Sequence, residues 1–426
     1  MICERSHDAT AVVTGPQEIG YVQMTSDGPG ELRPPHLSYG ALFMQFLRFG
    51  TLAFGGPVAQ IAMIRHRLID EGRWMSSERF NRLLAVLQIL PGPEAHELCV
   101  HLGMRARGRI GGVLAGLGFM LPGLVLMLGL AWLYFSIGVK SGWMTSAFIG
   151  VQIAVLAVIV RAAHRIGRHV MVDRSLWFIG TASCAASLLG VSFWLILPAA
   201  GAAYALAQRG RRLEAAVLFL IALSAGLAVR YWLNDHGAPP VTAAALAPMS
   251  VSVAALFFTG LKAGLLTFGG AYTAIPVMRA DAARGGWISD GQFLDGVALA
   301  QVIPAPLIIF GTFVGYAGGG FPGAMALTAG IFLPAFSFSL IFYDRLELVL
   351  ENRSLHALLD GVAAAVVGLI VATVLQLGAS LVGTVPYWPL ALAIFGAALV
   401  AAYRWRAQLA IPITLVAAGL AGALAF

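Results

Sequence analysis

Two stretches of the chain, FLRFGTLAFGGPVAQIAMI at residues 46–64 and GLKAGLLTFGGAYTAIPVM at residues 260–278, align without a gap. The Phe-Gly-Gly triplet of the first falls on the Phe-Gly-Gly triplet of the second. Later stretches match in the same order, because LQILPGP at 87–93 falls on AQVIPAP at 300–306. The chain is therefore two copies of one module, and each copy carries the same two glycine- or proline-containing interruptions.

The composition places both modules in a membrane. Hydrophobic residues make up 59% of the 426 residues and charged residues 11%, whereas about 25% are charged in a soluble protein. Apolar runs near the length of about 20 residues that crosses a bilayer recur along the chain. Such long runs are unlike the short alternating segments of a membrane β-barrel. We therefore predict an all-α polytopic membrane protein with several spanning helices.

The polar segments divide the chain into four parts. Residues 1–36 read as a disordered cytoplasmic tail, 37–234 as the first transporter module, 235–250 as a linker and 251–426 as the second module. The net charge of +7 comes from arginines in short segments between apolar runs, so it predicts no nucleic-acid partner. The three scattered cysteines fit no disulfide or metal spacing, and we expect no cofactor.

Charge differences between equivalent loops indicate how the two modules are oriented across the membrane. A predicted loop at 161–174 carries four arginines, whereas its counterpart at 372–387 carries no charge. Lysine and arginine mark the cytoplasmic side of a membrane protein, so the same loop would lie inside in one module and outside in the other. This predicts an inverted-topology repeat, as in many secondary transporters. Chance drift in loop composition is the alternative explanation.

The Pro-Gly-Pro interruption at 91–93 is flanked by arginines on both sides, at 73–82 and at 105–109. If both flanks are cytoplasmic, the segment enters the membrane, turns at the prolines and leaves again as two half-helices. A proline ring removes a backbone donor and collides with the preceding turn, which suits such a tip. The alternative is a kinked helix that crosses completely. We therefore expect broken or re-entrant helices in both modules.

The Phe-Gly-Gly interruption predicts an anion site. A helix that restarts after the glycines directs free N–H groups and a positive dipole end at this point. Arg48 and Lys262 lie at equivalent positions six residues before each triplet, and a cation within the membrane is by default a functional candidate. The alternatives are a glycine pair used for helix packing and side chains that reach the membrane surface.

Four ionisable residues directly follow the Pro-Gly-Pro turn: Glu94, His96, Glu97 and His101. The two histidines are five residues apart, about 140° around a helix, so no metal site is expected. The second module has apolar residues here, which makes the charge a speciality of the first. Two interpretations stay open, namely a solvated arm of the hairpin or a proton-coupling group, since burial of a carboxylate favours its protonated form.

No pattern for nucleophilic, phosphoryl-transfer or metal catalysis is present, so we predict no enzyme and no catalytic residue. A membrane enzyme acting on a lipid-linked substrate is the alternative of another class, and it would need repeated polar catalytic groups near one interface. The candidate substrate-binding residues are Arg48, Phe54, Gly55, Gly56, Pro57, Gln88, Pro91, Gly92, Pro93, Lys262, Phe268, Gly269, Gly270, Gln301, Pro304 and Pro306.

The motifs FGGP at 54–57, a tryptophan-containing polar loop after it, Q-x-LPGPEA at 88–95 and G-x-x-LPG at 118–123 resemble the chromate ion transporter family in its long-chain, two-domain form. The resemblance covers residues 38–426. It implies a bacterial inner-membrane carrier that exports chromate, driven by the proton gradient, with the isosteric dianion sulfate as a competitor. Uptake of sulfate or another oxyanion is the runner-up, and a homodimer is an assembly that we keep open. Ala271 and Ala305 replace Pro57 and Gly92 in the second module, so the modules need not bind substrate equally.

Overall fold

A computed structural model of the protein describes residues 32, 34–88, 90, 92–137, 142–235, 251–267, 270–341, 353–405, 407 and 409–426. Some of the predictions lie outside the described residues. These are the predictions for residues 1–31 and 33 of the tail, for 236–250 of the linker, and for the candidate site residues Pro91, Phe268 and Gly269.

The described residues form helices joined by short connections. The first module contains α1 (Tyr39–Thr51), α2 (Gly56–Ile64), the π-helical η1 (Arg65–Glu71), α3 (Ser77–Leu87), α4 (Glu94–Ile137), α5 (Gly142–Val170), α6 (Arg174–Leu188), α7 (Phe193–Gln208) and α8 (Arg212–Asp235). The second contains α9 (Val253–Leu265), η3 (Ala271–Thr273), α10 (Ala274–Arg284), α11 (Asp290–Val302), η4 (Leu307–Ile309), α12 (Phe310–Ile341), α14 (Arg353–Val382), α15 (Trp388–Arg404) and α16 (Ala410–Ala425).

Several helices suit a bilayer. Within the described ranges, five helices are long and apolar enough to cross a membrane, namely α4, α5, α8, α12 and α14. The helices α7, α9, α15 and α16 are also apolar but shorter. The prediction of an all-α polytopic membrane protein is thereby confirmed.

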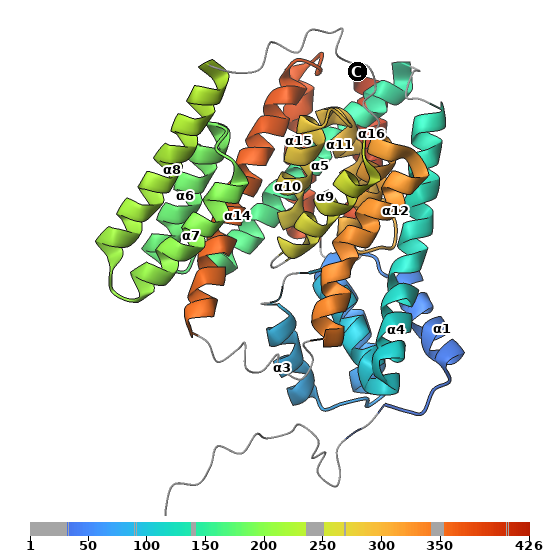
Figure 1. Cartoon of the computed structure of the whole chain (residues 1–426). Helices are drawn as coiled ribbons and strands as arrows, with labels where there is room; N and C mark the ends of the chain where they lie inside the picture. Colours follow the sequence, from blue (N-terminus) through green and yellow to red (C-terminus); the bar gives the residue numbers. More distant parts are fainter. Residues whose placement is uncertain are drawn as a thin grey trace, which may run out of the picture. The chain divides into compact units, whose positions relative to one another are not determined.

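The helices α4 and α12 bend sharply at equivalent positions (Figure 1). In α4 the bend lies at Arg107 and Gly108, where Gly108 has φ 63° and ψ −161°. In α12 Gly320 has φ 59° and ψ −150°, nearly the same conformation. Such a positive φ with extended ψ is open essentially only to glycine. The chain folds back here, since Gly103 faces the carbonyl oxygen of Gly111 so closely that a Cβ would overlap it. Broken helices are thus present in both modules.

The arms that follow these bends run in opposite directions. Gly112 of α4 lies against Leu340 of α12. Gly116, four residues further along α4, lies against Phe336, which comes four residues before Leu340 in α12. The numbering therefore rises along one arm as it falls along the other. Because these arms are equivalent parts of the two modules, their antiparallel contact is the relation that an inverted repeat requires.

Glycines set equivalent close contacts in each module. Gly50 of α1 packs on the carbonyl oxygen of Phe119 in α4, and Gly264 of α9 packs in the same way on that of Ile331 in α12. Small residues let membrane helices approach closely without a hydrophobic driving force. The α1–α4 pair and the α9–α12 pair are therefore the same structural unit.

The modules also exchange helix contacts. Gly150 of α5 packs against Ala418 of α16, and its counterpart Gly361 of α14 packs against Ala200 of α7. Each long helix thus packs against one of the last helices of the other module, and α5 also contacts α11, α14 and α15 of the second module.

Two predicted loops are wrong in extent. The helix α5 continues to Val170 and carries Arg161, Arg165 and Arg168, and Arg174 is the first residue of α6. The helix α14 continues to Val382, so most of 372–387 is helical too. Clustered arginines do not by themselves indicate a loop, because long side chains on the last turns of a helix carry charge to the surface equally well.

Candidate functional site

The helix interruptions of the two modules meet. The amide nitrogen of Gly92, in the Pro-Gly-Pro turn of the first module, donates a 2.9 Å hydrogen bond to the carbonyl oxygen of Thr267, directly before the second module's Phe-Gly-Gly triplet. Conversely, the Gln60 amide of α2 donates to the carbonyl oxygen of Ala305, between the prolines of the second module, over 3.0 Å. The proline interruption of each module therefore contacts the region of the Phe-Gly-Gly interruption of the opposite module.

The first interruption ends in an uncapped helix N-terminus. Gly55 is the N-cap of α2 and has φ 88°, and no side chain caps the helix. Pro57 lies in its first turn, where its missing N–H costs nothing because the first N–H groups of a helix have no partner within it. The start of α2 therefore presents backbone donors and a partial positive charge.

A cavity of about 70 Å³ lies at this helix start. Since one water needs roughly 10–15 Å³ measured in this way, the cavity has room for a small ion. Both modules supply its walls, which consist of Gly55, Gly56, Pro57, Val158, Arg161, Ala162, Arg165, Tyr272, Ala300, Gln301, Ile303, Ala305, Leu307, Ile411 and Pro412.

Two arginines give the cavity its charge. Arg161 and Arg165 are four residues apart on α5 and therefore share one face of that helix. Both act electrostatically on Tyr272, and Arg165 also acts on Glu94. The Tyr272 hydroxyl donates to the side-chain oxygen of Gln301 over 3.4 Å. Two guanidinium groups, a helix N-terminus and neutral polar groups are the chemistry of an oxyanion site.

The structure brings some of the predicted site residues into the cavity. Gly55, Gly56, Pro57 and Gln301 line it. Gly92 and Pro93 are buried at the turn that is hydrogen-bonded to Thr267. In the second module Gly270 and Pro306 are buried as well, whereas Pro304 is half-buried. Phe54 of the first module is also half-buried. Ala305, between the two prolines of the second module, lines the cavity in their place.

Three predicted residues lie elsewhere. Gln88 and Arg48 are exposed and do not line this cavity. Lys262 forms an ion pair with the buried Asp281, which also accepts a hydrogen bond from Thr259 over 3.1 Å. Lys262 is therefore already partly neutralised by the protein.

Arg161 and Arg165 of α5 are candidate site residues that sequence reasoning missed. Their spacing of four was visible in the sequence, as was the absence of any counterpart charge in the second module. Two arginines four residues apart that directly follow the apolar run VQIAVLAVIV at 151–160 are the signal that points to a charged face on a membrane helix.

The ionisable cluster behind the Pro-Gly-Pro turn is mostly buried. Glu94 is 8% exposed, and His96 and Glu97 are 0% exposed. His96 packs edge-on against Phe332 of α12, with ring centroids 4.8 Å apart. Neither carboxylate oxygen of Glu97 has a hydrogen-bond partner among the described residues. The interpretation of this segment as a solvated arm is therefore wrong for these three residues. His101, one turn further along α4, is half-buried.

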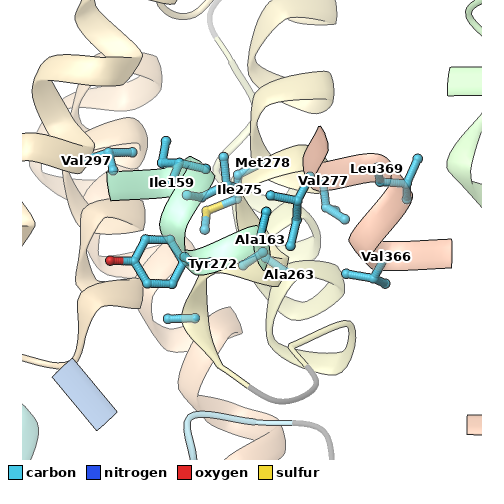
Figure 2. Close-up of a cluster of buried hydrophobic side chains, with 14 of the residues drawn as sticks. Ile159, Ala163, Ala263, Tyr272, Ile275, Val277, Met278, Val297, Val366 and Leu369 are labelled. Carbon is cyan, nitrogen blue, oxygen red and sulfur yellow. The ribbon is translucent and has the colours of Figure 1, made fainter. Parts of the chain in front are cut away.

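The second module surrounds η3 and α10 with apolar side chains. Figure 2 shows Ile275, Val277 and Met278 packed together with side chains of α5, α9, α11 and α14. Ala372 of α14 takes the position equivalent to Arg161 and is fully buried. In Figure 2 the Tyr272 hydroxyl points away from the labelled aliphatic side chains. The charged cavity thus belongs to the first module's interruption.

Comparison with known proteins places the chain among transporters. A family model described as "Chromate transporter" matches residues 40–207 and again residues 254–423, one match in each module. A chromate transport protein from Pseudomonas aeruginosa is 56% identical over 402 residues, which cover 94% of this chain and 96% of that protein. A chromate transport protein from Cupriavidus metallidurans is 32% identical over 375 residues, which cover 82% and 85%. A probable chromate transport protein from Synechococcus elongatus is 29% identical over 405 residues, which cover 91% and 96%. No solved structure matches the chain significantly.

Proposed function

The chain belongs to the chromate transporter family, and we propose that it is a secondary carrier that exports chromate in a cycle coupled to the proton gradient. It is a multi-pass protein of the bacterial inner membrane. The observation that carries the proposal is the cavity where Arg161 and Arg165 face the uncapped start of α2. The names of the relatives agree with a carrier rather than an enzyme.

The cavity suits a tetrahedral dianion. Two guanidinium groups offset two negative charges, and their planar sets of N–H donors match oxyanions better than ammonium groups do. Sulfate has the same shape and charge as chromate, so it should compete for the same place. The described residues that line the cavity include no carboxylate to bind a cation. Both arginines would repel a cation.

The arrangement of the modules supports alternating access. Transporters built from inverted repeats bind substrate where broken helices from both repeats meet, and one repeat rocks against the other. Here Gly55 and Gln301, from opposite modules, line one cavity. A small relative rotation of the modules would therefore open the same cavity to the other side.

Glu94 is the residue through which we link anion and proton. Its carboxyl group acts on Arg165, a wall of the cavity. Protonation of Glu94 would remove a negative charge next to the anion and leave Arg165 free to bind it. Proton and anion affinities are then thermodynamically coupled in both directions. Glu97 lies one turn deeper, and an ionised carboxylate without hydrogen bonds is costly there, so we propose it as a proton carrier as well.

Arg48 and Lys262 keep a proposed role outside the cavity. Arg48 is exposed on the last turn of α1, three residues before that helix ends. An exposed cation at this place would attract the dianion towards the interruption, an effect that salt weakens. Lys262 would hold the equivalent region of the second module through Asp281.

Transport into inside-out vesicles tests this function. Vesicles that contain the protein should accumulate labelled chromate faster when a proton gradient is imposed, and excess sulfate should slow the uptake. Accumulation of chromate only in right-side-out vesicles would contradict export. Uptake that is indifferent to the pH gradient would contradict proton coupling, and sulfate uptake without chromate uptake would favour a sulfate carrier.

A further inference from the structure

A second cavity, of about 960 Å³, lies at the other end of α5. Apolar residues and residues with hydroxyl, amide or carboxyl groups line it together: Tyr134, Phe135, Thr145, Phe148, Ile149, Gln152, Ser289, Asp290, Gly291, Gln292, Asp295, Ser380, Leu381 and Thr384. None of these residues lines the cavity of the arginines. The hydroxyl and amide groups make this second cavity suitable for water.

Asp295 is the buried acid of this cavity. It is 3% exposed and lies on α11, its carboxylate accepting one hydrogen bond from the Tyr134 hydroxyl of α4 over 2.7 Å. The other carboxylate oxygen accepts from the Gln152 amide of α5 over 2.8 Å. One carboxyl group therefore ties three helices together, and both of its partners are neutral.

The same two helices connect the two cavities. Gln152 and Arg161 are nine residues apart on α5, about 14 Å along a helix, and Asp295 and Gln301 are six apart on α11, about 9 Å. Between the polar ends lie buried apolar residues, including Leu156 of α5 and Val297 of α11. Figure 2 shows Val297 next to Ile159 of α5 in this layer. The two ends of the α5–α11 pair therefore border separate cavities.

We propose that Asp295 is a proton-binding site, supplied with protons through the second cavity, that controls the anion cavity at the opposite end of α5 and α11. This inference rests on the proposed function as a proton-coupled carrier, and it adds a proton site distinct from Glu94 and Glu97. Its ligand is a proton delivered by water.

Among the residues that the structure describes, no cation pairs with Asp295. From α4 it faces Tyr134, and from α5 the neutral Gln152. Arg279 of α10 is held by Asp290 over 2.8 Å and by Gln376 of α14. The remaining α14 residues on the cavity wall, Ser380, Leu381 and Thr384, are uncharged, and the sequences of η4, α12 and α16 contain no charged side chain.

Burial and hydrogen bonding act in opposite directions on the pKa of Asp295 and together bring it into the physiological range. Burial raises the pKa of Asp295 to about 7, and the hydrogen bonds from Gln152 and Tyr134 act in the opposite direction. A proton on Asp295 removes the charge that strengthens both hydrogen bonds, and it requires one oxygen to donate instead of accept. The contact between α4, α5 and α11 is therefore weaker in the protonated state. The ends of α5 and α11 that carry Arg161 and Gln301 are then freer to move.

Infrared titration of the purified, anion-free protein tests this site directly. In the wild type, the carbonyl band of a protonated carboxyl group should gain intensity as the pH falls through about 7, because burial raises the pKa of Asp295 to about that value. Asp295→Asn should lose that component, whereas Glu78→Gln, which removes an exposed carboxylate, should retain it. An unchanged titration in Asp295→Asn would overturn the proposal.

A second variant keeps the carboxyl group and changes only its partner. Tyr134→Phe removes one hydrogen bond to the ionised form, so the midpoint of the infrared titration should move to higher pH. A midpoint that stays where it is would contradict a site governed by this cluster. Chromate binding measured at several pH values should follow the same shift. Because the infrared measurement needs no anion, it separates failure of this site from failure of chromate transport.

Discussion

The amide nitrogen of Gly92 donates a hydrogen bond to the carbonyl oxygen of Thr267, 175 positions further along the chain, over 2.9 Å. This contact joins the proline turn of one module to the glycine turn of the other. The Gln60–Ala305 hydrogen bond joins the remaining two interruptions in the same crossed manner. Backbone groups at the interruptions thus find partners in the opposite module, one in its backbone and one in a side-chain amide, which meets the requirement that non-helical backbone within a membrane be hydrogen-bonded.

Gly92→Ala should disrupt this junction. Gly92 has φ 151°, and a Cβ there would overlap the carboxyl group of Glu97 and contact Ala335. The backbone alone should cost about 1–2 kcal/mol, and we expect a lower melting temperature together with loss of chromate transport. Gly129→Ala is the matched control, since nothing lies within 4 Å of that position in α4, and it should melt at or above the wild-type temperature. Equal melting temperatures for both variants would contradict the crowding at Gly92.

The repeat and the broken helices could be predicted because glycine and proline act locally. A Phe-Gly-Gly or Pro-x-Pro interruption changes the backbone wherever it occurs, so its recurrence at matching places is visible in one sequence. The pairing of Gly92 with Thr267 could not be predicted in this way, because it depends on how two distant segments pack. The bend at Gly108 lies in the arginine-rich segment 105–109, where the sequence predicts that the hairpin leaves the membrane, but the sequence does not indicate which backbone conformation this glycine adopts.

The arginines of α5 were misassigned for a different reason. Charge clusters predict where a chain meets water, but they do not tell a loop from the last turns of a helix. The helix continues because neighbouring helices bury Ala162, Ala163 and Ile166 between the arginines. Only the folded arrangement shows that Arg161 and Arg165 face a cavity between the modules.

Cysteine labelling tests the inverted topology. Ser380, an exposed residue near the end of α14, lies at the second cavity, whereas Val172, 75% exposed, follows α5. We expect a membrane-impermeant reagent to label Ser380→Cys in intact cells and to label Val172→Cys only after permeabilisation, in both cases in a background without the native cysteines. Labelling of both variants from the same side would rule out opposite orientations of these equivalent helix ends.

Arg48→Ala separates the approach of the anion from its binding. The sequence alone predicts that this substitution abolishes transport, and that Arg48→Lys keeps part of it. With Arg48 exposed outside the cavity, we expect its removal to slow transport most at low ionic strength, because screening weakens steering by an exposed charge. The measurement is the initial rate of chromate transport at several salt concentrations. A normally expressed Arg48→Ala variant with wild-type rates at all salt concentrations would remove this residue from the pathway.

Glu94→Gln and Glu97→Gln test the coupling of transport to protons. Each substitution fixes a neutral side chain, so a residue that carries the proton should leave chromate exchange intact but abolish its response to a pH gradient. Glu94→Gln should also bind chromate more tightly at high pH, because it removes the negative charge that acts on Arg165. Transport in vesicles with and without a pH gradient, together with binding at two pH values, checks both effects. Full pH-driven transport in both variants would exclude these glutamates as proton carriers.

Chromate binding to purified Arg161→Gln and Arg165→Gln variants tests the anion site most directly. Loss of one charge-assisted hydrogen-bonding partner should cost about 1.5–3 kcal/mol, which is a roughly tenfold to hundredfold rise in Kd. Arg168→Gln, which removes an exposed arginine of the same helix outside the cavity, should bind chromate as the wild type does. Wild-type affinity in both Arg161→Gln and Arg165→Gln, or an equal loss in Arg168→Gln, would contradict an anion site between α2 and α5.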